Sequence, residues 1–337
     1  METATTIVRF EIDDSFRPPR LLRNRHLQSL LPTLPVRRRA LDPQLRPVLD
    51  ASRELLLECG NGVRLQAFQS LHPHALTPRV AVLLHGWEGS AESTYVLSLA
   101  AQLYRRGFDV VRLNLRDHGA THHLNRELFH SCRLAEVVGA LCEIQRRYAG
   151  LPLHLCGFSL GGNFLLRAAA QAHAAQLALA RVVAISPVLE PSATLEALER
   201  APRSYQSYFI RRWTRSLLSK QRAWPAEYDL AGLLHLRSLR QLTRELILRF
   251  TPFESLEQYL DGYAITGERL AGLTAPAVII TSLDDPIIPA ADLERLPPRD
   301  PLKLVLTRYG GHCGFLERLS TATWAERRAA AELDAIA

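Results

Sequence analysis

Residues 157–163 read Gly-Phe-Ser-Leu-Gly-Gly-Asn and directly follow an apolar run at residues 151–156. The first five satisfy the pattern Gly-x-Ser-x-Gly, and an alanine-rich stretch with helical spacing follows at residues 160–176. Side chains flanking the serine of such a strand-to-helix turn would collide with the neighbouring strand and helix, which explains both glycines. This context predicts that Ser159 is a nucleophile held on a strained turn. The alternative is a glycine-rich turn in which the serine has no chemical role.

The surrounding sequence predicts an α/β fold with a mostly parallel central sheet flanked by helices. Between residues 80 and 186, apolar runs typical of buried strands alternate with segments of helical spacing, the pattern of a right-handed βαβ succession. A hairpin is expected before them, because Gly60-Asn61-Gly62 separates two strand-like runs, 53–59 and 63–68. The later strands are predicted at 80–84, 108–115, 151–156, 181–185, 277–282 and 303–307, and the helices at 93–105, 133–148, 160–176 and 324–336.

Residues 187–272 interrupt the alternation and contain no convincing strand. Helices are expected at 204–219, 236–250 and 256–263. Because ordinary connections are only a few residues long, we expect a helical cap insertion at about 190–262, over the carboxyl ends of the strands. The predicted organisation is an extension at 1–50 that packs on the body and an α/β domain at 51–337 that carries the cap. The cap aromatics suit an acyl-chain pocket and, equally, packing of the cap onto the body: Tyr205, Tyr208, Phe209, Trp213, Phe250 and Phe253.

A serine hydroxyl needs a general base, and the later sequence offers an acid and a histidine in suitable places. Residues 283–289 read Leu-Asp-Asp-Pro-Ile-Ile-Pro after one predicted strand, and residues 308–314 read Arg-Tyr-Gly-Gly-His-Cys-Gly after the last. The order Ser, acid, His is the one that accompanies a nucleophile elbow. We expect His312 to take the proton of Ser159 and Asp285 to orient His312. Asp285 is preferred to Asp284 because Asp285 and Pro289 form Asp-x-x-x-Pro; Asp284 is expected to cap the turn.

An oxyanion formed at Ser159 requires hydrogen-bond donors. One is expected to be the backbone N–H of Leu160, and the other that of Trp87, in the loop His-Gly-Trp-Glu-Gly-Ser at residues 85–90. His85 is expected to be structural. Glu88 is expected to face outward, since a carboxylate aimed at the site would oppose an oxyanion.

No metal and no cofactor are predicted. His118 and His122 have the spacing His-x-x-x-His, but Gly119 favours a loop over a helix there, so metal binding is not expected. This loop is expected beside the mouth of the active site.

Composition indicates a globular chain with a large core, since 47% of its 337 residues are apolar. We find no apolar stretch long enough to span a bilayer and no apolar signal segment near Met1. Five scattered cysteines without a Cys-x-x-Cys pair are typical of free thiols in a reducing compartment. A cytoplasmic location is therefore expected, whereas no oligomeric state is indicated.

The formal charge of +7 is concentrated near the N-terminus, where residues 17–39 contain seven arginines and no acid. Such a segment can contact an anionic membrane surface or nucleic acid. It also contains six leucines, so packing against the body is the favoured interpretation. No nucleic-acid-binding motif accompanies it, and nucleic acid is not an expected partner.

Several further motifs occur in addition to the pattern around Ser159. With these motifs, the chain resembles the YheT-like branch of the α/β-hydrolases. The resemblance covers nearly the whole chain and is weakest in the cap; it is carried by residues 16–19, 24–30, 85–90, 113–119, 129–131 and 310–315. It implies an α/β-hydrolase domain, makes the arginine-rich segment part of the fold, and implies carboxylic-ester hydrolysis. Eukaryotic members of the branch include enzymes that make medium-chain fatty acid ethyl esters and others that act on lipids. The chain departs from its relatives at residues 117–120, where they more often have a glycine- and serine-containing loop.

The function expected from these observations is a serine hydrolase that cleaves short- to medium-chain acyl esters through an acyl-enzyme. The substrate is expected to be a small-molecule or lipid ester. One alternative is an acyltransferase that makes esters from an acyl donor and an alcohol, because it uses the same acyl-enzyme. Another is a non-catalytic scaffold on a hydrolase fold, against which the complete set of Ser159, Asp285 and His312 argues.

Overall fold

The computed structural model describes residues 11–73, 79–296 and 300–335. Its centre is a nine-stranded sheet in the order β1-β9-β8-β7-β6-β4-β5-β3-β2. All neighbours are parallel except β2 with β3 and β3 with β5. The strands are β1 (Glu11–Ile12), β2 (Ser52–Glu58), β3 (Arg64–Ser70), β4 (Arg79–Leu84), β5 (Phe108–Leu113), β6 (Leu153–Phe158), β7 (Leu179–Ile185), β8 (Ala277–Ser282) and β9 (Leu302–Thr307).

Helices cover both faces of the sheet. Successive side chains of a strand point to opposite faces, so the buried strands present an apolar surface on each face, and each surface needs a covering layer. Val80, Val82 and Leu84 of β4 belong to one apolar cluster, whereas Ala81 and Leu83 belong to another. The first cluster includes side chains of α4 (Leu134–Arg147) and α5 (Leu160–Ala170). The second includes side chains of α2 (Pro35–Asp50), α3 (Thr94–Tyr104) and α10 (Trp324–Asp334). The predicted α/β fold with a mostly parallel sheet is confirmed.

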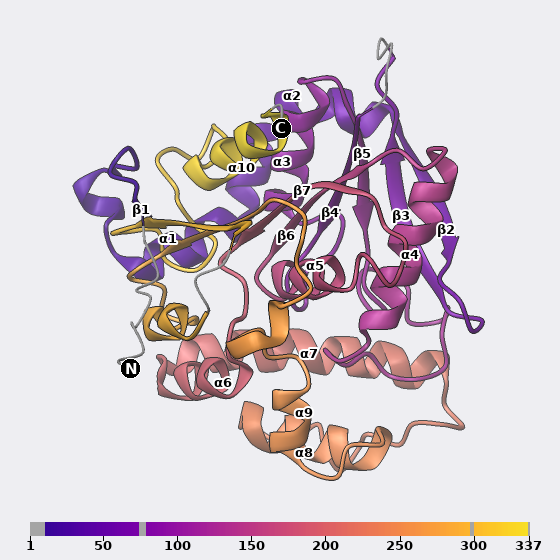
Figure 1. Cartoon of the computed structure of the whole chain (residues 1–337). Coiled ribbons are helices and arrows are strands. Elements are labelled where there is room, and N and C mark those ends of the chain that lie inside the picture. Colours follow the sequence, from indigo (N-terminus) through magenta and orange to yellow (C-terminus); the bar gives the residue numbers. More distant parts are fainter. Residues whose placement is uncertain (1–10, 74–78, 297–299, 336–337) are drawn as a thin grey trace, which may run out of the picture.

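Between β7 and β8 the chain forms four α-helices, which we call the helical insertion: α6 (Pro191–Arg200), α7 (Arg203–Ala223), α8 (Leu239–Phe250) and α9 (Leu256–Asp261). They lie together below the sheet in Figure 1. The backbone N–H of Ile265 donates to the Leu189 carbonyl at 2.9 Å, which joins the start of the insertion to its end. A separate apolar cluster, with Leu217, Leu233 and Leu242, fills the insertion. Helix α6 was not predicted, although Pro191 stands at its first position, where proline is favoured.

The described N-terminal residues contact the sheet and its helices, whereas the predicted division of the chain at residue 50 stays a prediction. Strand β1 pairs with β9, and the short helices η1 (Arg20–Leu22), α1 (Arg25–Leu30) and η2 (Leu31–Thr33) lead into α2. Arg37 of α2 is fully buried and donates to both carboxylate oxygens of Glu326 in α10, at 2.8 and 3.0 Å. The 3-10 helices η3 (Gly267–Leu270) and η4 (Ala290–Arg295) complete the described structure. No helix within its three ranges is both long and apolar enough to cross a bilayer.

Candidate active site

Ser159 occupies a strained turn between β6 and α5. Its backbone angles, φ 51° and ψ −120°, lie in a region that non-glycine residues rarely adopt. A Cβ atom on Gly157 would lie 2.4 Å from the backbone of Gly161, and a Cβ on Gly161 would lie 2.4 Å from the His85 carbonyl oxygen. Only glycine therefore fits on either side of the serine, as the sequence pattern indicated.

The structure brings Ser159, His312 and Asp285 together at the carboxyl ends of β6, β9 and β8. The Ser159 Oγ lies 2.9 Å from the His312 Nε2, and the His312 Nδ1 lies 2.9 Å from the Asp285 Oδ2. The other Asp285 oxygen accepts hydrogen bonds from the backbone N–H groups of Ile287 and Ile288. The carboxylate is thereby fixed on both sides.

Asp284 has a different position from its neighbour. Its Oδ1 accepts a hydrogen bond of 2.9 Å from the backbone N–H of Gly311, immediately before His312. Asp284 therefore holds the histidine loop, whereas Asp285 faces the imidazole. The assignment of Asp285 rather than Asp284 as the partner of His312 stays a prediction, and this geometry supports it.

The electrostatics favour a proton on His312. Burial by itself opposes the charged imidazolium, but the Asp285 carboxylate outweighs burial and holds the pKa of His312 well above its usual value. The same carboxylate stabilises the imidazolium that forms when Ser159 loses its proton.

The loop after β4 passes close to the serine. A Cβ on Gly86 would lie 3.2 Å from the Ser159 Cβ, so this glycine permits the approach. Trp87 follows it and stacks on Phe209 of α7, with ring centroids 5.4 Å apart and planes 13° apart. His85 is buried, with one ring nitrogen 2.7 Å from the Gly86 carbonyl oxygen, and burial lowers its pKa to about 4. His85 is thus a structural residue, as expected.

The expectation that Glu88 faces outward is wrong. Glu88 has a left-handed backbone conformation, with φ 56°, and lines the same cavity as Ser159; its carboxyl group is largely removed from solvent. Its backbone N–H donates to the His118 Nε2 at 3.2 Å. Burial raises the pKa of Glu88 to about 7, and the partly compensating Arg212 charge does not restore the usual value. Sequence reasoning did not foresee a carboxyl with so raised a pKa at this position.

A cavity of about 470 Å³ lies between this loop, the histidine loop and the helical insertion. Ser159 and His312 line it, together with apolar side chains that include Leu195 of α6, Ile247 of α8 and Leu260 of α9. Four of the six predicted cap aromatics also line it: Tyr205, Tyr208, Phe209 and Trp213. The other two do not, because Phe250 packs on Tyr228 and Phe253 on Tyr259. Four of the aromatics thus line the cavity and two pack inside the insertion, and an acyl-chain pocket stays a prediction.

Helix α1 holds the histidine loop, a feature that the sequence analysis missed. The Ser29 Oγ accepts a hydrogen bond from the His312 backbone N–H at 2.9 Å and donates to the Arg25 carbonyl at 2.7 Å. The fully buried Gln28 side chain bonds to both the backbone N–H and the carbonyl of Leu316. A Cβ on Gly311 would lie 2.4 Å from the Arg25 carbonyl oxygen. The sequence feature that could have indicated these contacts is the motif at residues 24–30.

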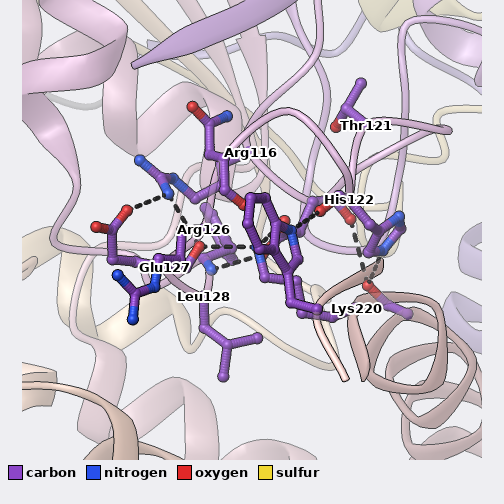
Figure 2. Close-up of polar contacts among 12 residues, drawn as sticks. Arg116, Thr121, His122, Arg126, Glu127, Leu128 and Lys220 are labelled. Atoms are coloured by element: carbon purple, nitrogen blue, oxygen red, sulfur yellow. Dashed lines mark hydrogen bonds and ion pairs between the residues drawn. The ribbon is translucent and has the colours of Figure 1, made fainter. Parts of the chain in front are cut away.

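A buried ion pair joins the helical insertion to the loop after β5. The Nζ of Lys220, in α7, donates to the Asp117 Oδ1 at 2.9 Å and to the carbonyl groups of Asn125 and Glu127 at 2.6 and 3.0 Å. Figure 2 shows Lys220 beside Glu127, which also pairs with Arg116. Burial raises the pKa of Asp117 and lowers that of Lys220, so each charge depends on the other. This contact fixes α7 against the body.

The two histidines at His-x-x-x-His spacing do not converge. The His118 Nδ1 lies 2.7 Å from the Arg116 carbonyl oxygen, whereas the His122 Nε2 lies 2.8 Å from the Ser216 Oγ. Across residues 11–73, 79–296 and 300–335, no group of three or more His, Cys, Asp or Glu side chains is arranged to hold a metal ion.

Comparison with known protein families identifies the family to which this chain belongs. The family model described as "alpha/beta hydrolase fold" matches residues 80–319, which contain Ser159, Asp285 and His312. The chain belongs to the α/β hydrolase fold family. Its relatives in this family include "Putative esterase YheT" of Escherichia coli (strain K12), 27% identical over 97% of this chain and 95% of that protein.

Other α/β hydrolase relatives match over a smaller share of their length. "Phospholipase ABHD3" of Mus musculus is 24% identical over 72% of this chain and 60% of that protein. "Monoacylglycerol lipase ABHD2" of Mus musculus is 22% identical over 74% of this chain and 63% of that protein. The resemblance to the YheT-like branch is confirmed, and so is the prediction of an enzyme of the ester-hydrolase class.

Solved structures agree with the α/β hydrolase fold. A membrane phospholipase A has a TM-score of 0.54 and 17% identity, covering 92% of this chain and 93% of its own. A serine hydrolase from Cycloclasticus zankles has a TM-score of 0.52 and 15% identity, covering 79% and 93%. At such identities the likeness shows the fold alone.

Proposed function

We propose that this chain hydrolyses carboxylic esters of short- to medium-chain acyl groups, with Ser159 as nucleophile, His312 as general base and acid, and Asp285 as the residue that orients His312. The observation that carries the proposal is the continuous pair of 2.9 Å contacts from Ser159 Oγ through His312 to Asp285, at the wall of an apolar cavity. This geometry is what a serine nucleophile needs in order to lose its proton during attack.

The reaction has two balanced halves. Ser159 Oγ attacks the ester carbonyl carbon while His312 Nε2 takes the hydroxyl proton, and collapse of the tetrahedral intermediate expels the alcohol, which receives that proton. The resulting acyl-enzyme is then attacked by water, whose proton passes to His312. Collapse of the second intermediate breaks the bond to Ser159 Oγ, returns the proton to Ser159 and releases the acid.

The backbone N–H groups of Trp87 and Leu160 are proposed to bind the oxyanion. Leu160 begins α5, so its N–H is among those that have no partner within the helix. Trp87 follows Gly86, the residue that approaches Ser159 closely. The positive end of the α5 dipole adds to the stabilisation of negative charge.

The helical insertion is proposed to act as a cap that binds the acyl group. Apolar side chains of α6, α8 and α9 line the cavity, and its volume of about 470 Å³ lies in the range of small-ligand pockets. The relatives named esterase, phospholipase and monoacylglycerol lipase support an ester of a small molecule or a lipid as substrate.

The test is intact-mass analysis after reaction with a fluorophosphonate, on the native protein and on Ser159→Ala. One adduct on the native protein and none on the folded variant is expected. No adduct on the native protein, or an adduct that persists in Ser159→Ala, would contradict the role of Ser159. A series of p-nitrophenyl esters from acetyl to dodecanoyl then measures acyl preference. The ratio of free acid to ethyl ester among the products, measured at increasing ethanol concentration, distinguishes hydrolysis from acyl transfer to an alcohol.

A further inference from the structure

The segment of residues 17–39, which we call the arginine–leucine segment, exposes large apolar side chains among its arginines. Leu21 is 86% exposed, and Leu27, Leu30, Leu34 and Val36 are exposed as well. Eleven large apolar residues are exposed in the described part of the chain, and five of them fall between residues 21 and 36. Such clustering is unlike scattered surface leucines, which carry no meaning by themselves.

Most of the arginines in the segment are exposed as well. The exposed arginines are Arg17, Arg20, Arg23, Arg25 and Arg39. Nearby acids are already engaged: Asp14 pairs with Arg308, Glu92 with Arg112 and, more distantly, Arg38, and Asp284 accepts from the Gly311 backbone. The exposed part of the segment therefore carries a net positive charge, to which an anionic surface is complementary.

The orientation of the segment is fixed from within. Gln28 and Pro32 are buried, and the fully buried Arg37 pairs with Glu326, so the segment cannot turn its leucines inward. The same segment borders the active-site cavity, whose lining includes Ser29, Leu30 and Thr33. Figure 1 shows α1 at the β1–β9 end of the sheet, the end from which the histidine loop also comes. Leu30 is thus both exposed at the surface and part of the wall of the cavity that contains Ser159.

We propose that the arginine–leucine segment docks on an anionic lipid surface, with its leucines among the acyl chains and its arginines at the headgroups. Apolar side chains interleaved with arginine suit the membrane interface, where burial and charge attraction add together. Nucleic acid, the other anionic partner, offers no apolar layer for the leucines. Docking in this orientation places the cavity edge at Leu30 against the membrane. The inference concerns binding alone and stands apart from the hydrolysis proposed for Ser159.

The test is flotation of the full chain with vesicles of phosphatidylcholine alone and of phosphatidylcholine mixed with phosphatidylglycerol. Binding to the anionic vesicles is expected, with weaker binding at high salt and little binding to the neutral vesicles. Ser159→Ala is expected to bind like the native chain. Vesicle binding therefore remains measurable even if the chain turns out not to hydrolyse esters.

Matched variants separate the segment from the rest of the surface. Arg20→Gln/Arg23→Gln is expected to reduce binding roughly 30-fold, since each arginine near the surface contributes about fivefold. Arg53→Gln/Arg105→Gln removes the same charge from exposed arginines outside the segment and is expected to change binding much less. Leu21→Ser is expected to reduce binding about tenfold, whereas Leu71→Ser, at another exposed leucine, is not.

Three outcomes would overturn the proposal. The first is absence of binding to anionic vesicles by a chain that circular dichroism shows to be folded. The second is an equal loss of binding in the segment and control variants. The third is a change of oligomeric state on Leu21→Ser in light scattering, without vesicle binding, which would assign the face to a second copy of the chain.

Discussion

The Ser29 hydroxyl accepts a hydrogen bond of 2.9 Å from the backbone N–H of His312, across 283 positions of sequence. The imidazole of His312 contacts Ser159 and Asp285, but its backbone is held by α1. The N-terminal segment therefore contributes to the geometry of the active site without a place in the chemistry, and Ser29 is a positioning residue.

Ser29→Ala is expected to lower kcat about tenfold and to leave KM nearly unchanged, because His312 loses its backbone anchor while the acyl pocket stays intact. Ser29→Thr keeps the hydroxyl and is expected to restore most of the rate. Steady-state kinetics on a water-soluble ester measures both. A parallel rise in KM, or no rescue by threonine, would indicate a general packing defect instead.

The dependence of activity on pH follows from His312. Its imidazole must be neutral to accept the Ser159 proton, and Asp285 holds its pKa well above the usual value. We therefore expect kcat/KM to rise with pH. The apparent pKa of this rise should lie above that of free histidine, which is about 6.5. Asp285→Asn is expected to reduce kcat on the order of 10⁴-fold and to move the remaining acid limb to lower pH. An unshifted acid limb would show that Asp285 does not control His312.

Glu88 is expected to limit activity on the alkaline side. With a pKa of about 7 it is neutral below that pH and negative above it, and it lines the same cavity as Ser159. Glu88→Gln stays neutral and is expected to exceed the native kcat/KM about tenfold at pH 9, with little difference at pH 6. Glu257→Gln, on the exposed side of α9, is the matched control. Parallel pH profiles of Glu88→Gln and the native chain would contradict this role.

The close contacts of Gly161 predict a strong effect of a single methyl group. Gly161→Ala places a Cβ against the carbonyl oxygens of Leu84 and His85, at 2.5 and 2.4 Å. We expect a loss of more than about 3 kcal/mol in the free energy of unfolding and of nearly all activity. Gly232→Ala, where a Cβ meets no atom within 4 Å, is expected to be neutral. Chemical denaturation of both variants measures the difference.

The sequence predicted those parts of the molecule that depend on local pattern. Continuous apolar runs between helical segments located the main strands. The pattern Gly-x-Ser-x-Gly placed Ser159 at the end of a strand, and the parallel topology brings Asp285 and His312 to the same edge of the sheet. Their catalytic roles and the cytoplasmic location stay predictions. The choice of Asp285 over Asp284 also stays a prediction, supported by the 2.9 Å contact between the Asp285 carboxylate and His312.

Features that depend on tertiary contacts escaped sequence reasoning. Helix α2 contains Pro43 and Pro47, which argue against a helix, yet packing of Leu41 and Leu45 against the α3 side of the core compensates for the two lost backbone donors. Glu88 combines a left-handed backbone with a largely buried carboxyl, and glutamate gives no sequence signal for either. The partnership of Ser29 with His312 spans nearly the whole chain, so no local pattern marks it.

The Arg37–Glu326 ion pair has a consequence for biosynthesis. A ribosome makes α2 early and α10 late. When the histidine loop is synthesised, Ser29 has already been made, whereas Glu326 has not. The buried arginine has no counter-charge until residue 326 has left the exit tunnel. Hydrolytic competence is therefore expected only after translation has passed this point, so that unfinished chains carry Ser159 without an assembled site.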